Sequence, residues 1–486
     1  MTEKVNTKIV IVGSGFGGLC IAIKLKKAGI HDFVVLEKEK SLGGTWRDNT
    51  YPGAECDIPS ALYSYSFEHN SDWEFKWSGQ AQILQYQQQT SQKYGLGQHI
   101  KYCQAVISAK YSQEGAYWLT ETSAGQIYQS QYFISAVGQL NIPSTPYFNG
   151  AETFQGAQFH SSRWNHGVDL SEKRVAVIGN AASAVQFIPE VAKTAKYLCV
   201  YQRSANWVLP KLDRAYTKWE QKISDKVPLI TKFYRFMIWA MGEYGVFGAI
   251  KGNRFLQWSY TRMGLRYLKE KIKDPSMRKV LTPTYQIGAK RILFSDHYYD
   301  ALARSNVELK HQALDHINEA GIVESDQKKV EFDVIIYATG FQTNPFLAEI
   351  DVEGKSGNKL HNHWSKGAFA YKGIMTHGFP NLFMLFGPNT NLGHTSIIIM
   401  LEAQADFIVE KIQSLQCKDK VSCEVKKQVE DVYNEQLQAQ LSKLAFSKVD
   451  NSWYMDNHRI TNNWAGGTRE YQRLLKQVNW ADYHLV

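Results

Sequence analysis

The sequence has few cysteines, and none of them stand at a metal-binding or redox spacing. The six are Cys20, Cys56, Cys103, Cys199, Cys417 and Cys423. Because no CxxC pair is present, the sequence argues against a zinc site and against a redox-active dithiol. Sparse cysteines and the lack of a recognisable signal peptide lead us to expect a cytoplasmic location and no bound metal.

Long apolar runs and strong charge are also missing. The closest approach to a membrane span, residues 236–250, contains Glu243 and three glycines, whereas a span needs about 18 uninterrupted apolar residues. The net charge is +9 over 486 residues, without a basic run. We therefore expect neither nucleic acid nor a membrane as a partner, and the sequence predicts no particular oligomeric state. The length indicates two or three domains.

A glycine-rich loop follows the first apolar run of the chain. The loop reads Gly13-Ser-Gly15-Phe-Gly-Gly18. It follows the apolar residues 9–12 of a buried parallel strand expected over 8–13, and a helix is expected after it over 19–28. In such a loop the first glycine makes a tight turn, the second admits a pyrophosphate, and the third allows close packing of helix on strand. The helix N-terminus then faces the phosphates. The loop predicts a dinucleotide site.

An acidic residue ends the second expected strand, residues 33–36. Glu37 lies 24 positions after Gly13, where a carboxylate accepts a hydrogen bond from a ribose hydroxyl and disfavours a 2′-phosphate. The first site is therefore expected to prefer FAD or NAD to NADP.

A second loop repeats the pattern a domain's length further on. Gly179, Ala181 and Ser183 follow a strand expected over 174–178, and the next strand, 197–201, leads into Arg203 and Ser204. A guanidinium forks onto phosphate oxygens, so this site is expected to prefer NADPH. The alternative is that Arg203 is an ordinary solvated arginine. Two such loops suggest two dinucleotides held for electron transfer between them.

The chain between and after the loops suggests interrupted domains. We expect an α/β fold with two Rossmann-like dinucleotide-binding domains, the first from 1–145 and 338–486, the second from 146–213 and 283–337, joined by small-residue turns. Residues 214–282 break the α/β rhythm and predict an inserted helical subdomain rich in aromatics. Three interpretations of its aromatics stay open: the core of a helix bundle, a wall or lid of a substrate pocket, and shallow membrane contact.

Several motifs resemble one enzyme family. Phe154, Gly156, His160 and Trp164 resemble the FxGxxxHxxxW fingerprint of type I Baeyer–Villiger monooxygenases. Residues 44–57 and 289–299 resemble further segments of that family. Residues 202–207 and 386–394 resemble segments of its hydroxyacetophenone monooxygenase-like branch. The resemblance covers essentially the whole chain.

The resemblance implies an FAD-containing, NADPH-dependent enzyme that uses O2. Through a C4a-peroxyflavin it would insert one oxygen atom next to the carbonyl of a small-molecule ketone, giving an ester or lactone. The first loop would then hold FAD and the second NADP. Three rival classes stay open: a monooxygenase that oxygenates nitrogen or sulfur atoms, a pyridine nucleotide–disulfide reductase, which the lack of CxxC disfavours, and a non-enzymatic flavin-binding scaffold.

The resemblance also assigns roles to single residues. Arg291 would stabilise the negative charge that develops in the reaction, with Asp57 as its partner. The alternatives are a plain NADP-phosphate contact for Arg291 and a turn cap for Asp57. His160 and Trp164 would couple domain position to the NADP state.

The expected cofactor contacts fall into two sets. The FAD set is Gly13, Gly15, Gly18, Glu37, Thr45, Trp46, Tyr51, Asp57 and Asn389, and the NADP set is Gly179, Ala181, Ser183, Arg203, Ser204, Lys290 and Arg291. Ala181 departs from the glycine usual in the family. We expect the domain to tolerate its methyl group, and two effects stay open: weaker NADPH binding, and a nucleotide displaced slightly outward. Trp453, Tyr454 and Trp464 are candidates for the substrate side, with core packing as the alternative.

Overall fold

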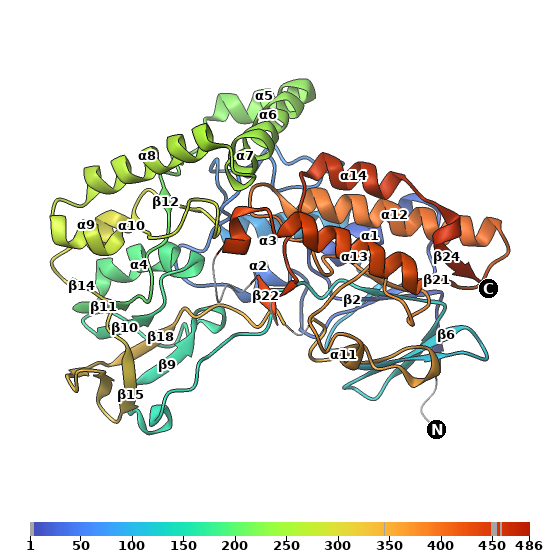
Figure 1. Cartoon of the computed structure of the whole chain (residues 1–486), viewed down its shortest axis with the longest axis horizontal. Helices are drawn as coiled ribbons and strands as arrows, with labels where there is room; N and C mark the ends of the chain where they lie inside the picture. Colours follow the sequence, from blue (N-terminus) through green and yellow to red (C-terminus); the bar gives the residue numbers. More distant parts are fainter. Residues whose placement is uncertain (1–3, 345, 449–453, 457–458) are drawn as a thin grey trace.

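Two parallel five-stranded sheets form the two halves of the molecule (Figure 1). The computed structural model describes residues 4–344, 346–448, 454–456 and 459–486. In the first half the order is β20 (Leu382–Met384), β8 (Tyr132–Ser135), β2 (Ile9–Val12), β3 (Phe33–Leu36) and β4 (Ile100–Lys101). In the second it is β14 (Val307–Lys310), β11 (Tyr197–Tyr201), β10 (Arg174–Ile178), β18 (Val334–Tyr337) and β9 (Ala157–His160).

The central strands are short apolar runs with every residue buried. This is true of β2, β3, β8 and β18, as expected for parallel strands covered on both faces. The strands expected over 33–36, 174–178 and 197–201 are confirmed at those bounds, and the strand expected over 8–13 is present as β2, one residue shorter at each end. Helix α1 (Phe16–Lys27) begins three residues before the predicted start, because the last residues of the glycine loop already form its first turn.

Helices and a second sheet cover the first half. One face carries α1 and α12 (Ile397–Cys417) in a common apolar core. The other face packs against a mixed sheet of β1 (Lys4–Asn6), β7 (Ile127–Ser130), β6 (Tyr117–Thr122), β5 (Val106–Ser112) and β19 (Asp351–Glu353). Also in this half are α2 (Thr45–Asp48), α3 (Gln80–Lys93), α11 (Leu360–His363), α13 (Lys427–Leu441), α14 (Thr468–Lys476), β21 (Cys423–Val425) and β24 (Tyr483–Leu485).

The second half is smaller and is covered by fewer elements. Helices α4 (Ala182–Thr194) and α10 (Tyr298–Leu302) pack on its sheet, and a three-stranded sheet of β15 (Leu314–Asn318), β16 (Gly321–Glu324) and β17 (Lys329–Glu331) covers the other face. The chain enters this half after β8 and leaves it after β18. The two crossings touch, because Pro143 and Phe341 form a β-bridge and the Ser144 amide donates to the Gly340 carbonyl at 2.9 Å.

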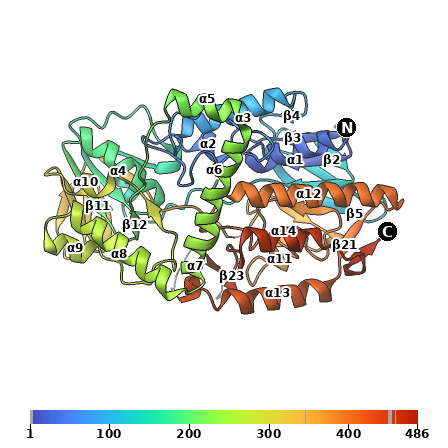
Figure 2. The same cartoon turned by 90° about the horizontal axis from the view of Figure 1, so that it is seen from above.

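The predicted helical insert is present between β12 (Val208–Leu209) and β13 (Leu293–Phe294). It contains α5 (Lys218–Lys226), α6 (Pro228–Ala240), the π-helix η3 (Met241–Val246), α7 (Phe247–Ile250), α8 (Arg254–Lys271) and α9 (Pro275–Leu281). Helix α7 joins the core of the first half and α8 that of the second, so the insert bridges both. Figure 2 shows α6 running across the boundary between the halves. In the described part of the chain, no helix combines the length and hydropathy needed to cross a bilayer.

Candidate active site

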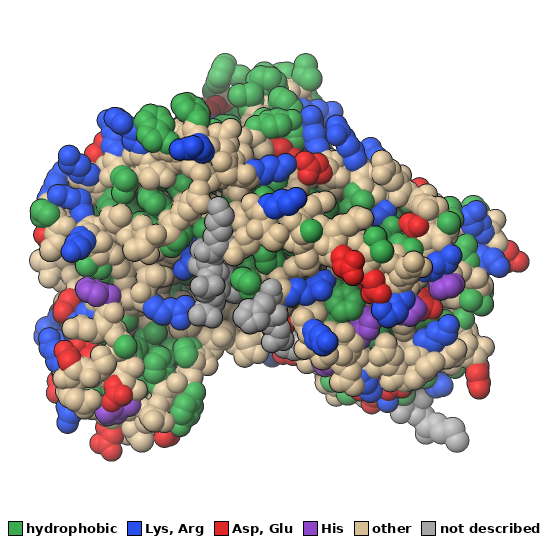
Figure 3. All heavy atoms as spheres, in the orientation of Figure 1, with side chains coloured by type: hydrophobic (Ala, Val, Ile, Leu, Met, Phe, Trp, Pro, Cys, Tyr) green, Lys and Arg blue, Asp and Glu red, His purple; other side chains and the backbone are tan. Residues whose placement is uncertain are grey.

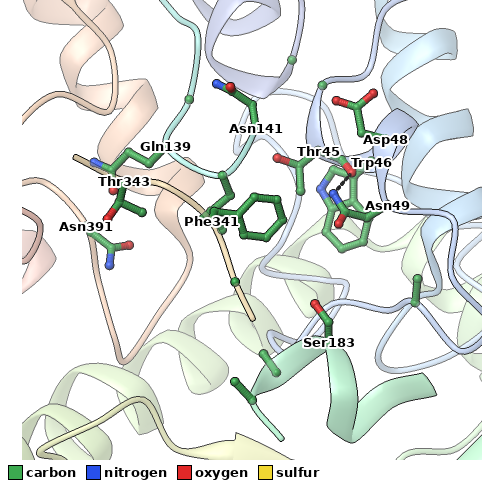
Figure 4. A pocket seen from close by; sticks show the side chains of 18 of the residues that line it. Thr45, Trp46, Asp48, Asn49, Gln139, Asn141, Ser183, Phe341, Thr343 and Asn391 are labelled. Atoms are coloured by element: carbon green, nitrogen blue, oxygen red, sulfur yellow. Dashed lines mark hydrogen bonds between the residues drawn. The ribbon is translucent and has the colours of Figure 1, made fainter. Parts of the chain in front are cut away.

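A cleft of about 1240 Å³ separates the two halves, and both glycine loops line it. Figure 4 shows Thr45 and Trp46 of the first half and Ser183 of the second around this cavity, with Phe341 of the crossing between them. The two predicted sites therefore open into one space. This arrangement allows two bound molecules to meet.

The first glycine of each loop adopts the conformation that the motif requires. Gly13 has φ +99° and Gly179 φ +110°, values that favour glycine. A Cβ on Gly13 would lie 2.7 Å from the Ala136 carbonyl oxygen, and one on Gly179 would lie 2.4 Å from that of Ala338. A Cβ on Gly18 would lie 1.8 Å from the Gly13 carbonyl oxygen, so α1 approaches the end of β2 more closely than a side chain at this position would allow.

The helices that follow the loops begin at the cleft, and their N-cap residues, Gly15 of α1 and Ala181 of α4, make no side-chain cap bond. First-turn amides and the positive end of each helix dipole are therefore available to an anion. Ala181 stands where the first loop has Gly15, and their φ/ψ values nearly coincide, −82°/−162° against −79°/−165°. The alanine therefore carries no backbone strain. Its exposed methyl group on the cleft wall is the remaining difference.

Glu37 lies at the end of β3, buried in the cleft wall. Its carboxylate accepts from the Ser14 amide at 2.9 Å and the Ser14 hydroxyl at 2.6 Å. The Arg47 guanidinium also donates to it at 2.9 Å. Sequence reasoning missed Arg47, since nothing in the local pattern ties a residue of α2 to the end of β3. The two bonds from Ser14 hold the Glu37 carboxylate against the glycine loop.

A pair of cations lies at the second loop. Lys290 and Arg203 both line the cleft, and the Lys290 ammonium lies 3.4 Å from the Ser204 hydroxyl. Burial, together with the positive charge of Arg203, lowers the pKa of Lys290. Within the described chain neither cation forms an ion pair with a carboxylate. Two converging positive charges without a counter-ion form a site for an anion.

Arg291 and Asp57 meet across the cleft, although 234 positions separate them in the sequence. The Arg291 Nη2 donates to Asp57 Oδ1 at 2.5 Å. Burial opposes the charge of Arg291, but the Asp57 carboxylate outweighs it and raises the pKa of the guanidinium. The Tyr454 hydroxyl accepts from the Arg291 backbone amide at 3.2 Å. The contact predicted between Arg291 and Asp57 is therefore present.

The aromatic residues of segment 44–57 have two different surroundings. Trp46 lines the cleft, and its indole donates to the Tyr63 hydroxyl at 3.1 Å. Tyr51 also lines the cleft, but its ring packs on Phe187 of α4, with 5.9 Å between centroids, and its hydroxyl donates to Gln186 at 2.8 Å. Tyr51 thus ties the two halves together. The importance of Gln186 had no sequence signal, because a lone glutamine inside a helix is an ordinary surface residue.

The four fingerprint residues lie in the second half and not on the cleft wall. Phe154 is in the core under β15–β17, and a Cβ on Gly156 would meet the Asp333 carbonyl oxygen at 2.3 Å. Burial lowers the pKa of His160, whose ring makes an edge contact with Phe341 at 5.9 Å. Trp164 packs on Phe187 at 5.3 Å. These residues therefore support α4 and the crossing, in keeping with a coupling role.

The C-terminal residues are placed differently from one another. The Asn389 amide donates to the Ile460 and Asn463 carbonyls at 2.7 and 3.1 Å and is turned away from the cleft. Asn391, two residues later, lines it instead (Figure 4). Trp464 packs on Tyr471 in the core. Trp453 lies outside the described residues.

Comparison with known proteins agrees with this arrangement. A family profile described as pyridine nucleotide-disulphide oxidoreductase matches residues 10–217. A Baeyer-Villiger monooxygenase of Pseudomonas aeruginosa is 38% identical over 484 residues, which cover 99% of this chain and 92% of the relative. The chain belongs to the Baeyer–Villiger monooxygenases.

Solved structures of other monooxygenases share the whole architecture. The closed form of cyclohexanone monooxygenase superposes with a TM-score of 0.90 at 25% identity, with all of both chains covered. OTEMO in complex with FAD and NADP gives 0.89 at 26% identity, also with both chains covered throughout. The predicted family and fold class, two dinucleotide-binding folds with a helical insert, are confirmed.

Proposed function

We propose that this Baeyer–Villiger monooxygenase binds FAD along the first glycine loop and NADPH along the second, and uses O2 to convert a ketone to an ester or lactone. The names of its relatives support the reaction class, and the FAD and NADP of the similar OTEMO structure support the cofactors. The proposal includes the domain limits. The FAD-binding domain comprises residues 1–145 and 338–486, and the NADP-binding domain comprises residues 146–213 and 283–337. So is a cytoplasmic location, for which the support is that all six cysteines are free.

The residues of the cleft fit both cofactors. The N-terminus of α1, where Gly15 makes no side-chain cap, and the open space beside Gly15, where a Cβ would have no neighbour closer than 3.7 Å, suit a pyrophosphate. The buried carboxylate of Glu37 suits a ribose hydroxyl and opposes a further phosphate. At the second loop Arg203 and Lys290 suit the 2′-phosphate of NADPH. When bound, the flavin and nicotinamide supply the electron transfer and oxygen activation.

The observation that carries the proposal is the Arg291–Asp57 pair at the meeting of the two sites. The second half supplies the guanidinium and the first half the carboxylate that orients it. Arginine remains charged at any working pH and offers several donors. Arg291 can therefore stabilise negative charge on a reacting oxygen, and Asp57 is the residue that positions it.

Arg291→Ala tests the proposal. The FAD-loaded variant and wild type are given NADPH, O2, cyclic, linear and aryl ketones, and a thioether, and the products are identified. We expect ester formation to fall by at least about a hundredfold, since loss of a donor aimed at developing charge costs about 3–4 kcal/mol. FAD content and melting temperature should be retained.

The matched control is Arg266→Ala, which removes an exposed arginine of α8 and should leave ester yield unchanged. Undiminished ester yield from Arg291→Ala would remove Arg291 from the reaction. Wild-type enzyme that forms sulfoxide but never ester would favour the nitrogen- and sulfur-oxygenating class.

A further inference from the structure

The helical insert exposes an unusual amount of apolar surface. Of the 21 large apolar side chains exposed in the described chain, 13 lie in residues 214–282, which are about a seventh of the sequence. We call these 13 the apolar patch: Trp219, Val227, Leu229, Ile230, Phe233, Phe236, Met237, Met241, Tyr244, Phe255, Trp258, Met263 and Leu265. Figure 3 shows hydrophobic side chains gathered at the top of the molecule, where Figure 1 places α5 and α6. Contiguous patches of this kind mark interaction sites.

Helix α6, at the centre of the patch, is amphipathic in the reverse of the usual sense. Its buried positions are Thr231, Arg235 and Trp239, two polar residues and one aromatic. The Arg235 guanidinium donates to the Ser64 hydroxyl at 2.8 Å and the Ser64 carbonyl at 3.2 Å in the first half. Its solvent side carries Leu229, Phe233 and Met237, which are 75%, 63% and 44% exposed. A surface helix of a globular protein usually turns its apolar stripe toward the core. Core packing therefore does not explain these side chains.

Positive charge is concentrated in the same segment. Residues 214–282 contain 15 Lys and Arg against five Asp and Glu, a net charge of +10, whereas the rest of the chain has 40 against 41. Lys218, Lys222 and Lys226 of α5 and Lys232 of α6 are exposed beside the apolar patch. The net charge of the whole protein thus originates in the insert.

We propose that the apolar patch lies on the surface of an anionic phospholipid membrane. Apolar and aromatic side chains enter the boundary between headgroups and acyl chains, while neighbouring lysines attract anionic headgroups. A second copy of the chain is a poorer occupant, because it would bring +10 against +10. The contact lies in the plane of the surface, which agrees with the lack of a spanning helix among the described residues.

From the sequence we expected no membrane partner for the protein as a whole, although shallow membrane contact stayed open as one of three interpretations of the aromatics in residues 214–282. That expectation rested on the length of apolar runs, which bears on spanning and not on adsorption. Which side chains of an aromatic-rich helix face outward could be read only from the folded chain.

Vesicle flotation with the full-length, FAD-loaded protein tests the proposal. We expect the wild type to float with vesicles of phosphatidylcholine containing about 30% phosphatidylglycerol at low salt. Binding should be weak to phosphatidylcholine alone and should fall in about 0.5 M NaCl, which screens the lysines. Wild type that stays with the soluble fraction under all conditions would overturn the proposal.

Two variants separate the apolar and electrostatic contributions. Leu229→Gln, Phe233→Gln and Met241→Gln together should lower the partition coefficient at least about tenfold. Lys218→Glu, Lys222→Glu and Lys226→Glu together should abolish the preference for anionic vesicles. Both variants should retain FAD, melting temperature and turnover of a water-soluble ketone, because all six side chains are exposed.

The matched control exchanges three exposed apolar side chains outside the insert, Tyr147, Val421 and Val432, for Gln. This control should bind vesicles as the wild type does. If it loses as much binding as the variant with Gln at positions 229, 233 and 241, the apolar patch is not the membrane-binding surface. Light scattering tests for self-association. If the wild type forms dimers and does not bind vesicles, and the variant with Gln at positions 229, 233 and 241 is monomeric, the partner of the apolar patch is a second copy of the chain and not a membrane.

Discussion

At the scale of single residues, charge placement distinguishes the two loops. Beside the first loop, strand β3 leads into the carboxylate of Glu37, which is paired with Arg47, whereas the second loop lies beside Arg203 and Lys290, which have no acidic partner in the described chain. The same backbone motif therefore presents opposite charges to a ribose. This difference is the physical basis for expecting NADPH, and not NADH, at the second loop.

Lys290→Ala should raise the KM for NADPH about ten- to a hundredfold and leave the KM for NADH nearly unchanged. A charge-assisted bond to phosphate contributes about 1.5–3 kcal/mol, and NADH lacks that phosphate. Steady-state kinetics with both nucleotides measure the effect. Lys420→Ala, an exposed lysine on the other half, is the control. Equal increases in both constants would show that Lys290 contacts something other than the 2′-phosphate.

Glu430 on α13 makes stability depend on pH. Burial raises the pKa of this carboxyl from its ordinary 4.5 to about 7, so its neutral form is favoured in the folded protein. A raised acid pKa contributes stability that is present below the unfolded value and lost as pH rises through the folded value. We therefore expect the wild type to lose about 2–3 kcal/mol between pH 4.5 and pH 8 from this group.

Glu430→Gln should remove that loss. The melting temperature of the variant, measured across the same range, should fall less toward pH 8 than that of the wild type. Glu435→Gln on the same helix, where the side chain is exposed, should behave as the wild type. A variant that keeps the full pH dependence would assign it to other groups.

At the scale of elements, a π-helix fastens the insert to the first half. In η3 the Glu243 carboxylate accepts from the Thr468 amide at 3.1 Å, the Thr468 hydroxyl at 3.0 Å and the Arg469 amide at 3.3 Å. It therefore caps α14, where a negative charge also suits the helix dipole. Burial opposes its charge, but the bonds from His394 and Thr468 outweigh it and lower the pKa of Glu243.

Glu243→Ala should loosen the insert. The buried amides of α14 would lose their acceptor, at a cost of about 1–3 kcal/mol each, so we expect a lower melting temperature and faster proteolysis within 214–282. Limited proteolysis followed by mass mapping measures this. Glu270→Ala removes an exposed acid of α8 and should have no effect. Unchanged cleavage in Glu243→Ala would mean that the other contacts of the insert, such as the packing of α7 and the Arg235–Ser64 bonds, are enough to hold it.

At the scale of the whole molecule, α4 connects the second half to the loop that carries Asp57. Gln186 accepts from the Tyr51 hydroxyl at 2.8 Å and donates to the Glu55 carbonyl at 2.9 Å. A further contact joins the Thr50 hydroxyl and the His166 ring at 2.8 Å. These bonds set how closely Asp57 approaches Arg291.

Gln186→Leu keeps the side-chain volume but removes the bonds between halves. We expect NADPH-driven flavin reduction to slow by about tenfold or less and more hydrogen peroxide to be released per NADPH, because orientation between the two sites is looser. Stopped-flow absorbance and peroxide assays measure both. Gln92→Leu on α3, an exposed position, is the control. Unaltered reduction and coupling would show that other contacts fix the geometry of the cleft.

The sequence by itself determined the two nucleotide loops, the main buried strands and the family motifs. Their signals are local: a glycine that needs positive φ, an apolar run of four or five residues, or an acid or a base at the end of a strand. The same local rules predicted that residues 214–282 are helical.

Only the tertiary structure decided which of these features meet. It joined Arg291 to Asp57 and Glu37 to Arg47, turned Asn389 away from the cleft and Asn391 toward it, and directed the apolar side of α6 outward. Such outcomes depend on contacts between segments far apart in the chain. Residue type determines what a side chain can bind, whereas packing determines what it reaches.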